Sequence, residues 1–212
     1  MKISDRVFAL DSTKGSYVYV ILGEEITLID TSLPFHGDGI MKELSSMNIQ
    51  PQDIKHILLT HYDLDHIGNA AKLAELTGAT LWASEADRLC ILGEADRPGF
   101  KKFLPYIFRV KKPESVKPYP VNGKINDITI LPTPGHTPGH VCLLFEDILF
   151  AGDLVENKGG TLIPYPSFWN WDTTLLKKSI KDISDYGFQW ICPAHGNPME
   201  RDGRWEQIQK SL

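Results

Sequence analysis

The sequence has no excess of positive charge, no long apolar run and few cysteines. Its formal net charge is −5, so it lacks the basic surface with which proteins bind a nucleic-acid backbone. No stretch approaches the roughly 18 apolar residues of a membrane span, and Asp5 precedes any apolar run long enough for a signal peptide. We therefore expect a soluble, cytoplasmic protein with no nucleic-acid and no membrane partner.

The cysteines are odd in number and lie at wide, unrelated spacings: Cys90, Cys142 and Cys192. This pattern argues against a disulfide framework and favours reduced thiols in a core. Repeats of fixed period, low-complexity tracts and interdomain linkers are also missing from the sequence. We expect one domain that spans residues 1–212.

Strand signals fall in two groups along the chain. The first group covers residues 7–10, 17–21, 25–30, 54–59 and 79–83. The second group covers residues 128–131, 141–145, 148–151 and 189–192. Apolar residues at helical spacing predict helices over residues 39–47, 67–76 and 173–186. This order favours an α/β fold in which two sheets pack face to face and helices cover them outside.

Two segments interrupt this alternation. Residues 84–120 begin with a helix-capping sequence at Ser84 and continue with polar, aromatic and proline-rich stretches. We expect them to form a helical insertion. Residues 156–172 contain Pro164 and Pro166 together with several aromatic residues, and we expect them to form a long loop.

Four potential metal ligands fall within six residues, directly after the strand predicted over residues 54–59. They are His61, Asp63, Asp65 and His66. Imidazole nitrogens and carboxylate oxygens bind divalent cations such as zinc, and a catalytic site leaves a position open for water or substrate. No folding requirement explains this density of ligands, so it favours metal-dependent hydrolysis.

Three later segments share the same design, because each places a His or an Asp just after an apolar strand. These residues are His136, Asp153 and His195. Glycine or proline lies beside each of them and allows tight turns and a close approach of the backbone to an ion. The four segments lie far apart in the sequence, so a shared metal site is the simplest reason for their common pattern.

The order of these four segments resembles the metallo-β-lactamase superfamily over nearly the whole chain. The resemblance implies a four-layer αββα sandwich of two mixed β-sheets covered by helices, with a pair of metal ions in the cleft between the sheet edges. The superfamily's first ligand motif is normally His-x-His-x-Asp-His, and Asp63 stands here in place of the second histidine. Most members are hydrolases.

The resemblance also implies a role for each ligand. Two groups of three side chains would each hold one metal ion: His61, Asp63 and His136 in one group, and Asp65, His66 and His195 in the other. Asp153 would bridge the two ions. Asp65 would also be catalytic, because it is placed to orient the attacking hydroxide and to carry a proton to the leaving group. Asp30, at the end of an early strand, either orients a ligand or serves a local turn.

Asp63 makes the ligand set one charge more negative than a histidine would. The extra negative charge weakens the Lewis acidity of the ions, and oxygen donors favour manganese or iron more than imidazole does. Zinc is the first expectation for the two divalent ions, with manganese and iron as alternatives.

Structural roles compete with the metal-binding interpretation. A single Asp in a strand-to-helix loop is more often a helix cap, and only the four segments together favour metal binding for Asp63 and Asp65. His140 could replace His136 as a ligand, but the motif favours His136 and leaves His140 as a hydrogen-bonded residue at a strand start. His36 is expected in a solvated loop.

Aromatic residues of the insertion and of the later loop are candidates for the substrate pocket. They include Phe103, Tyr106, Tyr165, Phe168 and Trp169. Substrate pockets are mostly apolar with a few polar anchors. The alternative is that these aromatics pack the insertion against the rest of the domain or form the surface of a homodimer.

We therefore expect a metal-dependent hydrolase that uses a hydroxide bound by two metal ions to cleave a small ester, lactone, thioester or amide. A non-haem diiron oxidoreductase of the same fold is an alternative, because such relatives carry a carboxylate at the position of Asp63. Their carboxylate is Glu, however, and a flavin domain usually follows. A catalytically silent binding module is a further alternative, and loss of ligands would be its sign.

Overall fold

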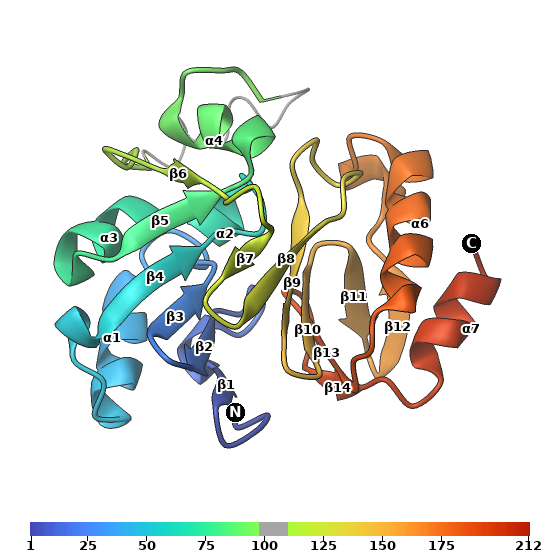
Figure 1. Ribbon diagram of the computed structural model, residues 1–212, viewed down its shortest axis with the longest axis horizontal. Helices are drawn as coiled ribbons and strands as arrows, with labels where there is room; N and C mark the ends of the chain where they lie inside the picture. The colour runs from blue at the N-terminus through green and yellow to red at the C-terminus, as the bar shows by residue number, and fades with distance from the viewer. Residues whose placement is uncertain (98–109) are drawn as a thin grey trace. The chain divides into compact units, whose positions relative to one another are not determined.

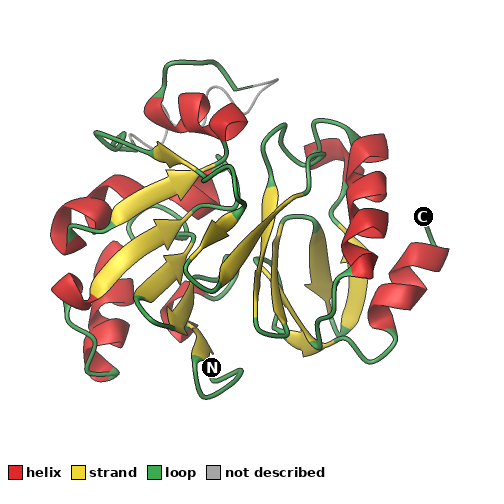
Figure 2. Cartoon of the chain, in the orientation of Figure 1, coloured by secondary structure: helices red, strands yellow, loops and turns green. Residues whose placement is uncertain are grey.

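The computed structural model describes residues 1–97 and 110–212 (Figure 1). The chain divides into two compact units, Met1–Pro118 and Tyr119–Leu212. Each unit contains one six-stranded sheet and its own helices (Figure 2).

The sheet of the first unit has the strand order β1-β2-β3-β4-β5-β6. Its strands are β1 (Val7–Ala9), β2 (Tyr19–Leu22), β3 (Ile26–Ile29), β4 (Ile54–Leu58), β5 (Thr80–Ala83) and β6 (Lys117–Pro118). The first three strands form an antiparallel meander, and β3 to β6 run parallel to one another. The sheet is therefore mixed, and β4 lies in its interior.

Helices α1 (Gly37–Ser46) and α3 (Ala70–Thr77) connect the parallel strands of this sheet. Their apolar residues share one buried cluster with the strands, which includes Ile40, Leu44, Leu73, Leu28 and Ile57. The connecting helices therefore shield one face of the sheet from water, which is what parallel strands require.

The ends of the helices follow from single residues. Gly78 adopts a left-handed conformation at φ 70° and ends α3. The Ser84 hydroxyl accepts a hydrogen bond from the Asp87 backbone N–H at 3.2 Å and starts α4 (Glu85–Leu92), as the sequence predicts. Helix α4 ends at Gly93, which adopts a left-handed conformation.

The second unit has a six-stranded sheet with the order β14-β13-β10-β9-β8-β7 and a separate two-stranded sheet of β11 and β12. The large sheet contains β7 (Lys124–Ile125), β8 (Ile128–Pro132), β9 (Val141–Phe145), β10 (Ile148–Gly152), β13 (Trp190–Pro193) and β14 (Met199–Glu200). Only β10 and β13 pair in parallel within this described sheet. The sheet is therefore mixed as well.

Helices α6 (Thr173–Asp182) and α7 (Arg204–Lys210) complete the second unit. Leu176, Ile180 and Trp205 of these helices share a buried cluster with Leu149 and Ile191 of the sheet. Asp172 starts α6, because its Oδ1 accepts a hydrogen bond from the Leu175 N–H at 2.9 Å. One continuous apolar cluster thus joins the helices to the strands.

The predicted α/β class with two mixed sheets and helices is confirmed, and one segment differs from its expected form. Residues 156–172 were expected to be a loop, but they overlap an antiparallel hairpin of β11 (Val155–Lys158) and β12 (Thr161–Pro164). Gly159 and Gly160, both at positive φ, supply the turn between the two strands. The prolines come at or after the end of β12, where they do not interrupt its pairing.

The expected helical insertion over residues 84–120 contains α4 and ends in β6, which pairs with β5. Residues 98–109 of this segment lie outside the described residues, so the insertion stays a prediction. No helix in the described part of the chain is long and apolar enough to cross a bilayer.

Gly68 tests how tightly the loop after β3 is packed. A Cβ atom at Gly68 would lie 2.4 Å from the Pro34 nitrogen and 2.6 Å from the Ser32 oxygen, both backbone atoms that cannot move independently. Gly68→Ala should therefore lower the free energy of unfolding by about 1–3 kcal/mol, measured by urea denaturation. Gly39→Ala is the control, because its Cβ would make an ordinary contact at 3.5 Å with Ser12. Equal stability of the two variants would contradict this packing.

Candidate metal centre

The four predicted ligands of the first unit form the N-terminal donor set, which follows β4 directly. His61 and Asp63 lie in the loop, whereas Asp65 and His66 lie on the short helix α2 (Leu64–Ile67). The helical turn forms because the Asp63 carbonyl accepts hydrogen bonds from the N–H groups of His66 and Ile67. The Asp63 side chain makes no capping hydrogen bond, so its carboxylate does not serve as the helix cap that was its structural alternative.

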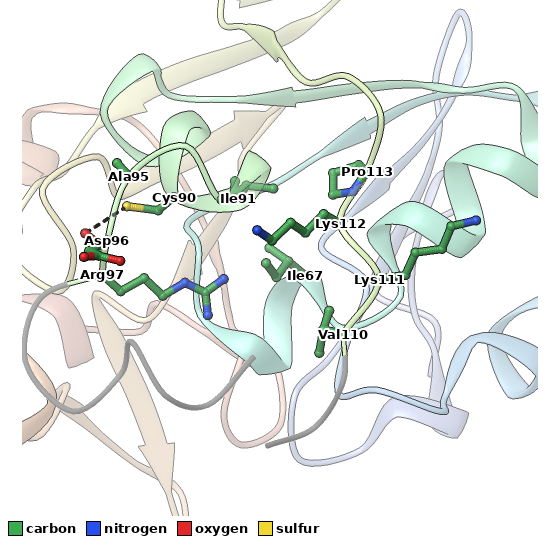
Figure 3. Close-up of a pocket in the computed structure, with 11 residues that line it drawn as sticks. Ile67, Cys90, Ile91, Ala95, Asp96, Arg97, Val110, Lys111, Lys112 and Pro113 are labelled. Carbon is green, nitrogen blue, oxygen red and sulfur yellow. Dashed lines mark hydrogen bonds between the residues drawn. The ribbon is translucent and has the colours of Figure 1, made fainter. Parts of the chain in front are cut away.

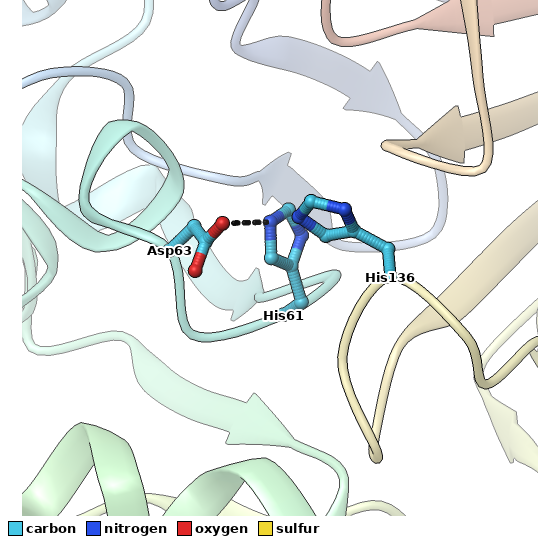
Figure 4. Close-up of side chains that lie close together, drawn as sticks. All are labelled: His61, Asp63 and His136. Atoms are coloured by element: carbon cyan, nitrogen blue, oxygen red, sulfur yellow. Dashed lines mark ion pairs between the residues drawn. The ribbon is translucent and has the colours of Figure 1, made fainter. Parts of the chain in front are cut away.

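Imidazole and carboxylate atoms face each other within this set. The His61 Nε2 lies 3.7 Å from the Asp63 Oδ2 (Figure 4), and the His66 Nε2 lies 3.8 Å from the Asp65 Oδ2. The rings of His61 and His66 are in contact, with centroids 3.9 Å apart. The loop and α2 therefore bring all four ligands of the set together.

Asp30 fixes the orientation of His66. Its Oδ2 accepts a hydrogen bond from the His66 Nδ1 at 2.8 Å and another from the Thr60 hydroxyl at 2.8 Å, and its Oδ1 accepts one from the Thr60 N–H. Asp30 is buried and has φ 59°, a left-handed conformation that Asp tolerates better than most residues. With Nδ1–H committed to Asp30, the Nε2 lone pair of His66 is available to a cation.

Thr60 extends the same arrangement to His61. Because its hydroxyl hydrogen is donated to Asp30, the Thr60 oxygen accepts the hydrogen bond at 3.0 Å from the His61 Nδ1–H. This leaves the His61 Nε2 without a hydrogen and directed at the side of Asp63. One buried carboxylate, assisted by one hydroxyl, thus sets the tautomer of both histidines in the set.

The three predicted ligands of the second unit form the C-terminal donor set. His136 lies in the loop between β8 and β9 (Figure 4), Asp153 follows β10 and His195 follows β13. Since β10 and β13 are parallel neighbours, Asp153 and His195 leave the sheet at the same edge. The Asp153 Oδ2 lies 3.5 Å from the His136 Nε2, and its Oδ1 lies 3.3 Å from the His195 Nε2. Each carboxylate oxygen therefore faces a different histidine.

Asn170 orients His136, a role that was not predicted from the sequence. The Asn170 amide donates a hydrogen bond to the Tyr165 carbonyl at 3.1 Å, so its Oδ1 accepts the hydrogen bond at 3.0 Å from the His136 Nδ1–H. The Asn170 side chain comes from the loop that follows the short helix Ser167–Trp169. A turn-forming Asn is common in any loop, which is why the residue type alone did not reveal it.

The donor atoms of both sets fit divalent cations. Two donors about 2.1 Å from one ion in a tetrahedral arrangement lie roughly 3.4 Å apart, whereas direct hydrogen bonds span about 2.7–3.2 Å. The four imidazole–carboxylate distances run from 3.3 to 3.8 Å and match the first spacing. Within each donor set, imidazole nitrogens and carboxylate oxygens therefore lie at spacings that suit a shared ion.

Arg97 supplies a buried positive charge near the N-terminal donor set. It is only 6% exposed, and its guanidinium carbon lies 5.4 Å from the centre of the Tyr62 ring. Burial lowers the pKa of Arg97, and the negative charge of Asp63 opposes that change. A guanidinium remains charged in proteins, so Arg97 offsets part of the extra negative charge that Asp63 brings.

A pocket of the first unit lies beside α4 (Figure 3). The side chains of Arg97 and Lys112 point toward its middle, and Cys90 lies at its edge. Burial raises the pKa of the Cys90 thiol, whose Sγ donates to the Asp96 carbonyl. Cys90 is therefore a protonated packing group and not a candidate nucleophile.

The predicted substrate residues are only partly described. Phe103 and Tyr106 lie outside the described residues. In the second unit, the Tyr165 ring packs against His136 with centroids 4.7 Å apart and against His195 with centroids 5.5 Å apart. Phe168 pairs with Trp169 at 4.9 Å and is 71% exposed. Tyr165 thus adjoins the C-terminal donor set, while Phe168 offers an apolar surface to solvent.

The remaining histidines that the sequence raised have hydrogen-bonded positions. His140 precedes β9 and is bound to Thr133 and to the Asp153 backbone, as expected for a strand-start residue. The His36 Nδ1 lies 3.0 Å from the Ser32 hydroxyl at the start of α1.

Comparison with known proteins identifies the family. Residues 12–211 match the metallo-beta-lactamase superfamily, and the chain belongs to it. The uncharacterized protein YobT of Bacillus subtilis is 29% identical over 195 residues, which cover 84% of this chain and 82% of YobT. A probable metallo-hydrolase of Methanocaldococcus jannaschii is 31% identical over 157 residues, covering 74% of this chain and 64% of that protein.

Solved structures show the same fold. The crystal structure of TTHA1623 in a di-iron-bound form is 21% identical to this chain and has a TM-score of 0.75, with 97% of this chain and 98% of that chain covered. The expected metallo-β-lactamase fold is confirmed. Together with the metallo-hydrolase relative, membership of the superfamily supports an enzyme, a metal-dependent hydrolase.

The anchoring of His66 by Asp30 can be tested by Asp30→Asn. The amide tolerates the left-handed backbone but cannot accept the hydrogen bonds of Thr60 and His66 on both atoms. We expect zinc affinity, measured by chelator competition, to fall about 10- to 100-fold. Asp38→Asn is the control, since Asp38 lies exposed on α1, where it forms an ion pair with Lys72 of α3. Unchanged affinity in Asp30→Asn would contradict the orienting role.

Proposed function

We propose that this protein hydrolyses a small ester, lactone, thioester or amide with two divalent cations held by the seven His and Asp ligands. The observation that carries this proposal is the position of the Asp153 carboxylate. Its two oxygens face two different histidines, His136 and His195, at 3.5 and 3.3 Å. This is the arrangement that a carboxylate needs in order to bridge two cations.

The proposed ligand groups combine the two donor sets. One cation would be held by His61, Asp63 and His136, and the other by Asp65, His66 and His195. Asp153 would serve both. This grouping is supported by the way each set presents imidazole nitrogens and carboxylate oxygens in pairs, with the opposite side of the ring anchored for His61, His66 and His136.

The chain's own groups would orient the reactants. When bound, the cations polarise the scissile carbonyl and lower the pKa of a coordinated water. Asp65 would orient that water and carry its proton to the leaving group. The Asp65 backbone is held in place, because the residue lies on α2 and its carbonyl accepts a hydrogen bond from the Ser16 hydroxyl. The side chain that carries the carboxylate therefore extends from a fixed position.

Metal identity follows from donor chemistry. Zinc suits the four imidazoles, whereas the three carboxylates Asp63, Asp65 and Asp153 suit manganese or iron better than an all-histidine set would. Arg97 offsets part of the carboxylate charge near Asp63. We propose zinc as the natural ion and retain manganese and iron as outcomes of the metal analysis, since the similar TTHA1623 was crystallised with two irons.

An oxidoreductase with two irons is the second candidate. It is favoured by the carboxylate at Asp63 and by the di-iron form of TTHA1623. Aerobic metal analysis and absorption spectroscopy separate the two functions, because a diiron centre is coloured and redox-active whereas a zinc centre is neither. A colourless protein that is active with zinc supports hydrolysis.

We further propose a cytoplasmic location and a small-molecule substrate, with no nucleic acid or membrane partner. The location is supported by the three free cysteines, of which Cys142 and Cys192 are buried. The acidic net charge of −5 supports the absence of a nucleic-acid partner.

Asp153→Ala tests the bridging role. The protein should be loaded separately with zinc, manganese and iron and screened against lactones, thioesters, aryl esters, amides, phosphoesters and β-lactams. We expect hydrolysis of at least one ester or amide by the unchanged protein and none above background by Asp153→Ala, which should also bind fewer ions per chain. Asp147→Ala is the control, because Asp147 is exposed in the turn before the same strand. Activity that survives Asp153→Ala would remove the bridging role.

The exposed aromatic Phe168 provides a test of substrate contact. We propose that Phe168, Trp169 and Tyr165 line the apolar side of the substrate site. Phe168→Ala should raise KM about 3- to 10-fold for apolar esters and leave kcat unchanged, because only substrate binding loses apolar contact. Tyr186→Ala is the control, since Tyr186 is an exposed aromatic of the same unit. Equal KM values for both variants would rule out contact between Phe168 and the substrate.

A further inference from the structure

A chain of buried side chains begins at the backbone of Asp153 and returns to the strand that carries it. The Asp153 N–H donates a hydrogen bond to the His140 Nε2 at 3.0 Å. On the other side of the ring, the His140 Nδ1 lies 2.9 Å from the Thr133 hydroxyl oxygen. His140 and Thr133 are at most 1% exposed. The Asp153 backbone is therefore linked by hydrogen bonds to side chains at the two ends of the loop between β8 and β9.

The direction of each hydrogen bond in this chain is determined. Since Nε2 accepts from Asp153, a neutral His140 carries its hydrogen on Nδ1 and donates it to the Thr133 oxygen. The Thr133 hydroxyl in turn donates to the Cys142 Sγ at 3.4 Å. Cys142 donates to the Ala151 carbonyl at 3.6 Å. Every member has one donor and one acceptor role.

The last member returns the chain to β10. Ala151 lies two residues before Asp153, so both ends of the hydrogen-bond chain attach to the same strand end. Burial raises the pKa of the Cys142 thiol to about 12, which keeps the hydrogen that it donates. The turn itself is tight, because Gly152 between these residues has φ 49°. Glycine adopts this left-handed conformation readily, and the hydrogen-bond chain links the residues on its two sides.

We propose that His140 is a positioning residue that acts on the metal centre through the Asp153 backbone N–H, with Thr133 fixing its tautomer. His140 holds the backbone from which the Asp153 carboxylate extends, and so keeps its two oxygens opposite His136 and His195. This role rests on the proposed bridging function of Asp153. It also accounts for the second histidine of the segment 133–140, which the ligand assignment leaves unused.

A competing role is metal binding by His140 itself. The geometry argues against it, because Nε2 accepts the Asp153 N–H and Nδ1 is engaged by Thr133. A purely structural role in packing the second unit is the other alternative. The positioning role and a purely structural role predict different results for a side chain that keeps the hydrogen-bond acceptor but lacks the imidazole ring.

The test compares His140→Leu with His140→Gln in the full-length protein. Leucine fills a similar volume but accepts no hydrogen bond, whereas the glutamine Oε1 can accept the Asp153 N–H near the position of Nε2. We expect His140→Leu to lower zinc affinity about 10- to 100-fold in chelator competition and to lower kcat more than it raises KM. His140→Gln should recover at least half of the lost affinity on a logarithmic scale. The zinc affinity of Thr133→Val should lie between those of His140→Leu and His140→Gln.

His56→Leu is the matched control. His56 also makes two side-chain hydrogen bonds, with Glu25 at 2.7 Å and with Trp82 at 3.1 Å, but it lies on β4 in the first unit and has no bond to a proposed ligand. Its replacement should leave zinc affinity unchanged. Equal losses of affinity in His140→Leu and His140→Gln, or the same loss in His56→Leu, would overturn the positioning role.

A second measurement does not depend on activity or on metal. In metal-free protein labelled with ¹⁵N, the Asp153 amide and the His140 Nε2 should show a scalar coupling across their hydrogen bond, and the His140 nitrogens should show the Nδ1–H tautomer. If this coupling is present but the unchanged protein binds no metal, the proposed function fails and the hydrogen bond stands. If the coupling is missing, the positioning role fails whatever metal is bound.

Discussion

The buried carboxylate of Asp30 is the constraint on which the N-terminal donor set depends. It binds His66 directly and His61 through the Thr60 hydroxyl, so two histidines from different parts of the loop and helix take their tautomers from one anion. The anion sits at the end of β3, next to β4 in the sheet, and its backbone N–H donates to the Leu58 carbonyl. Sheet pairing therefore controls ring orientation several residues away. Loss of this pairing would release both rings at once.

The C-terminal donor set reaches the same result with different groups. Asn170 anchors His136, and His140 holds the backbone of Asp153. Both units use anchoring partners that are distant in sequence: Asp30 for His66 in the first unit and Asn170 for His136 in the second. The first unit also offsets the negative charge of its additional carboxylate, Asp63, with the buried guanidinium of Arg97. Asp63, which stands where the superfamily's motif has a histidine, and the guanidinium of Arg97 are best understood as one feature of the site.

The sequence predicted the parts of this structure that depend on local pattern. Alternating apolar residues located the strands, and the density of His and Asp after them pointed to the candidate ligands, because both signals lie within a few residues of one another. The hairpin Val155–Pro164 was missed, since its polar strand β11 lacks the apolar alternation of a half-buried strand. Asn170, Thr133 and Arg97 were missed for a different reason. Asn170 and Thr133 bind histidines that lie 34 and 7 positions away in the sequence. Arg97 acts on Asp63 through its charge. The pattern of a single sequence does not record such pairs.

The anchored rings have a consequence for how a cation would enter. His61, His66 and His136 each have one nitrogen engaged by a protein group, so their rotation is already restricted before any ion arrives. Capture of an ion then freezes little additional side-chain motion, and more of the coordination energy is available as affinity. A centre whose rings are anchored in this way would therefore hold its ions firmly at low free metal concentrations.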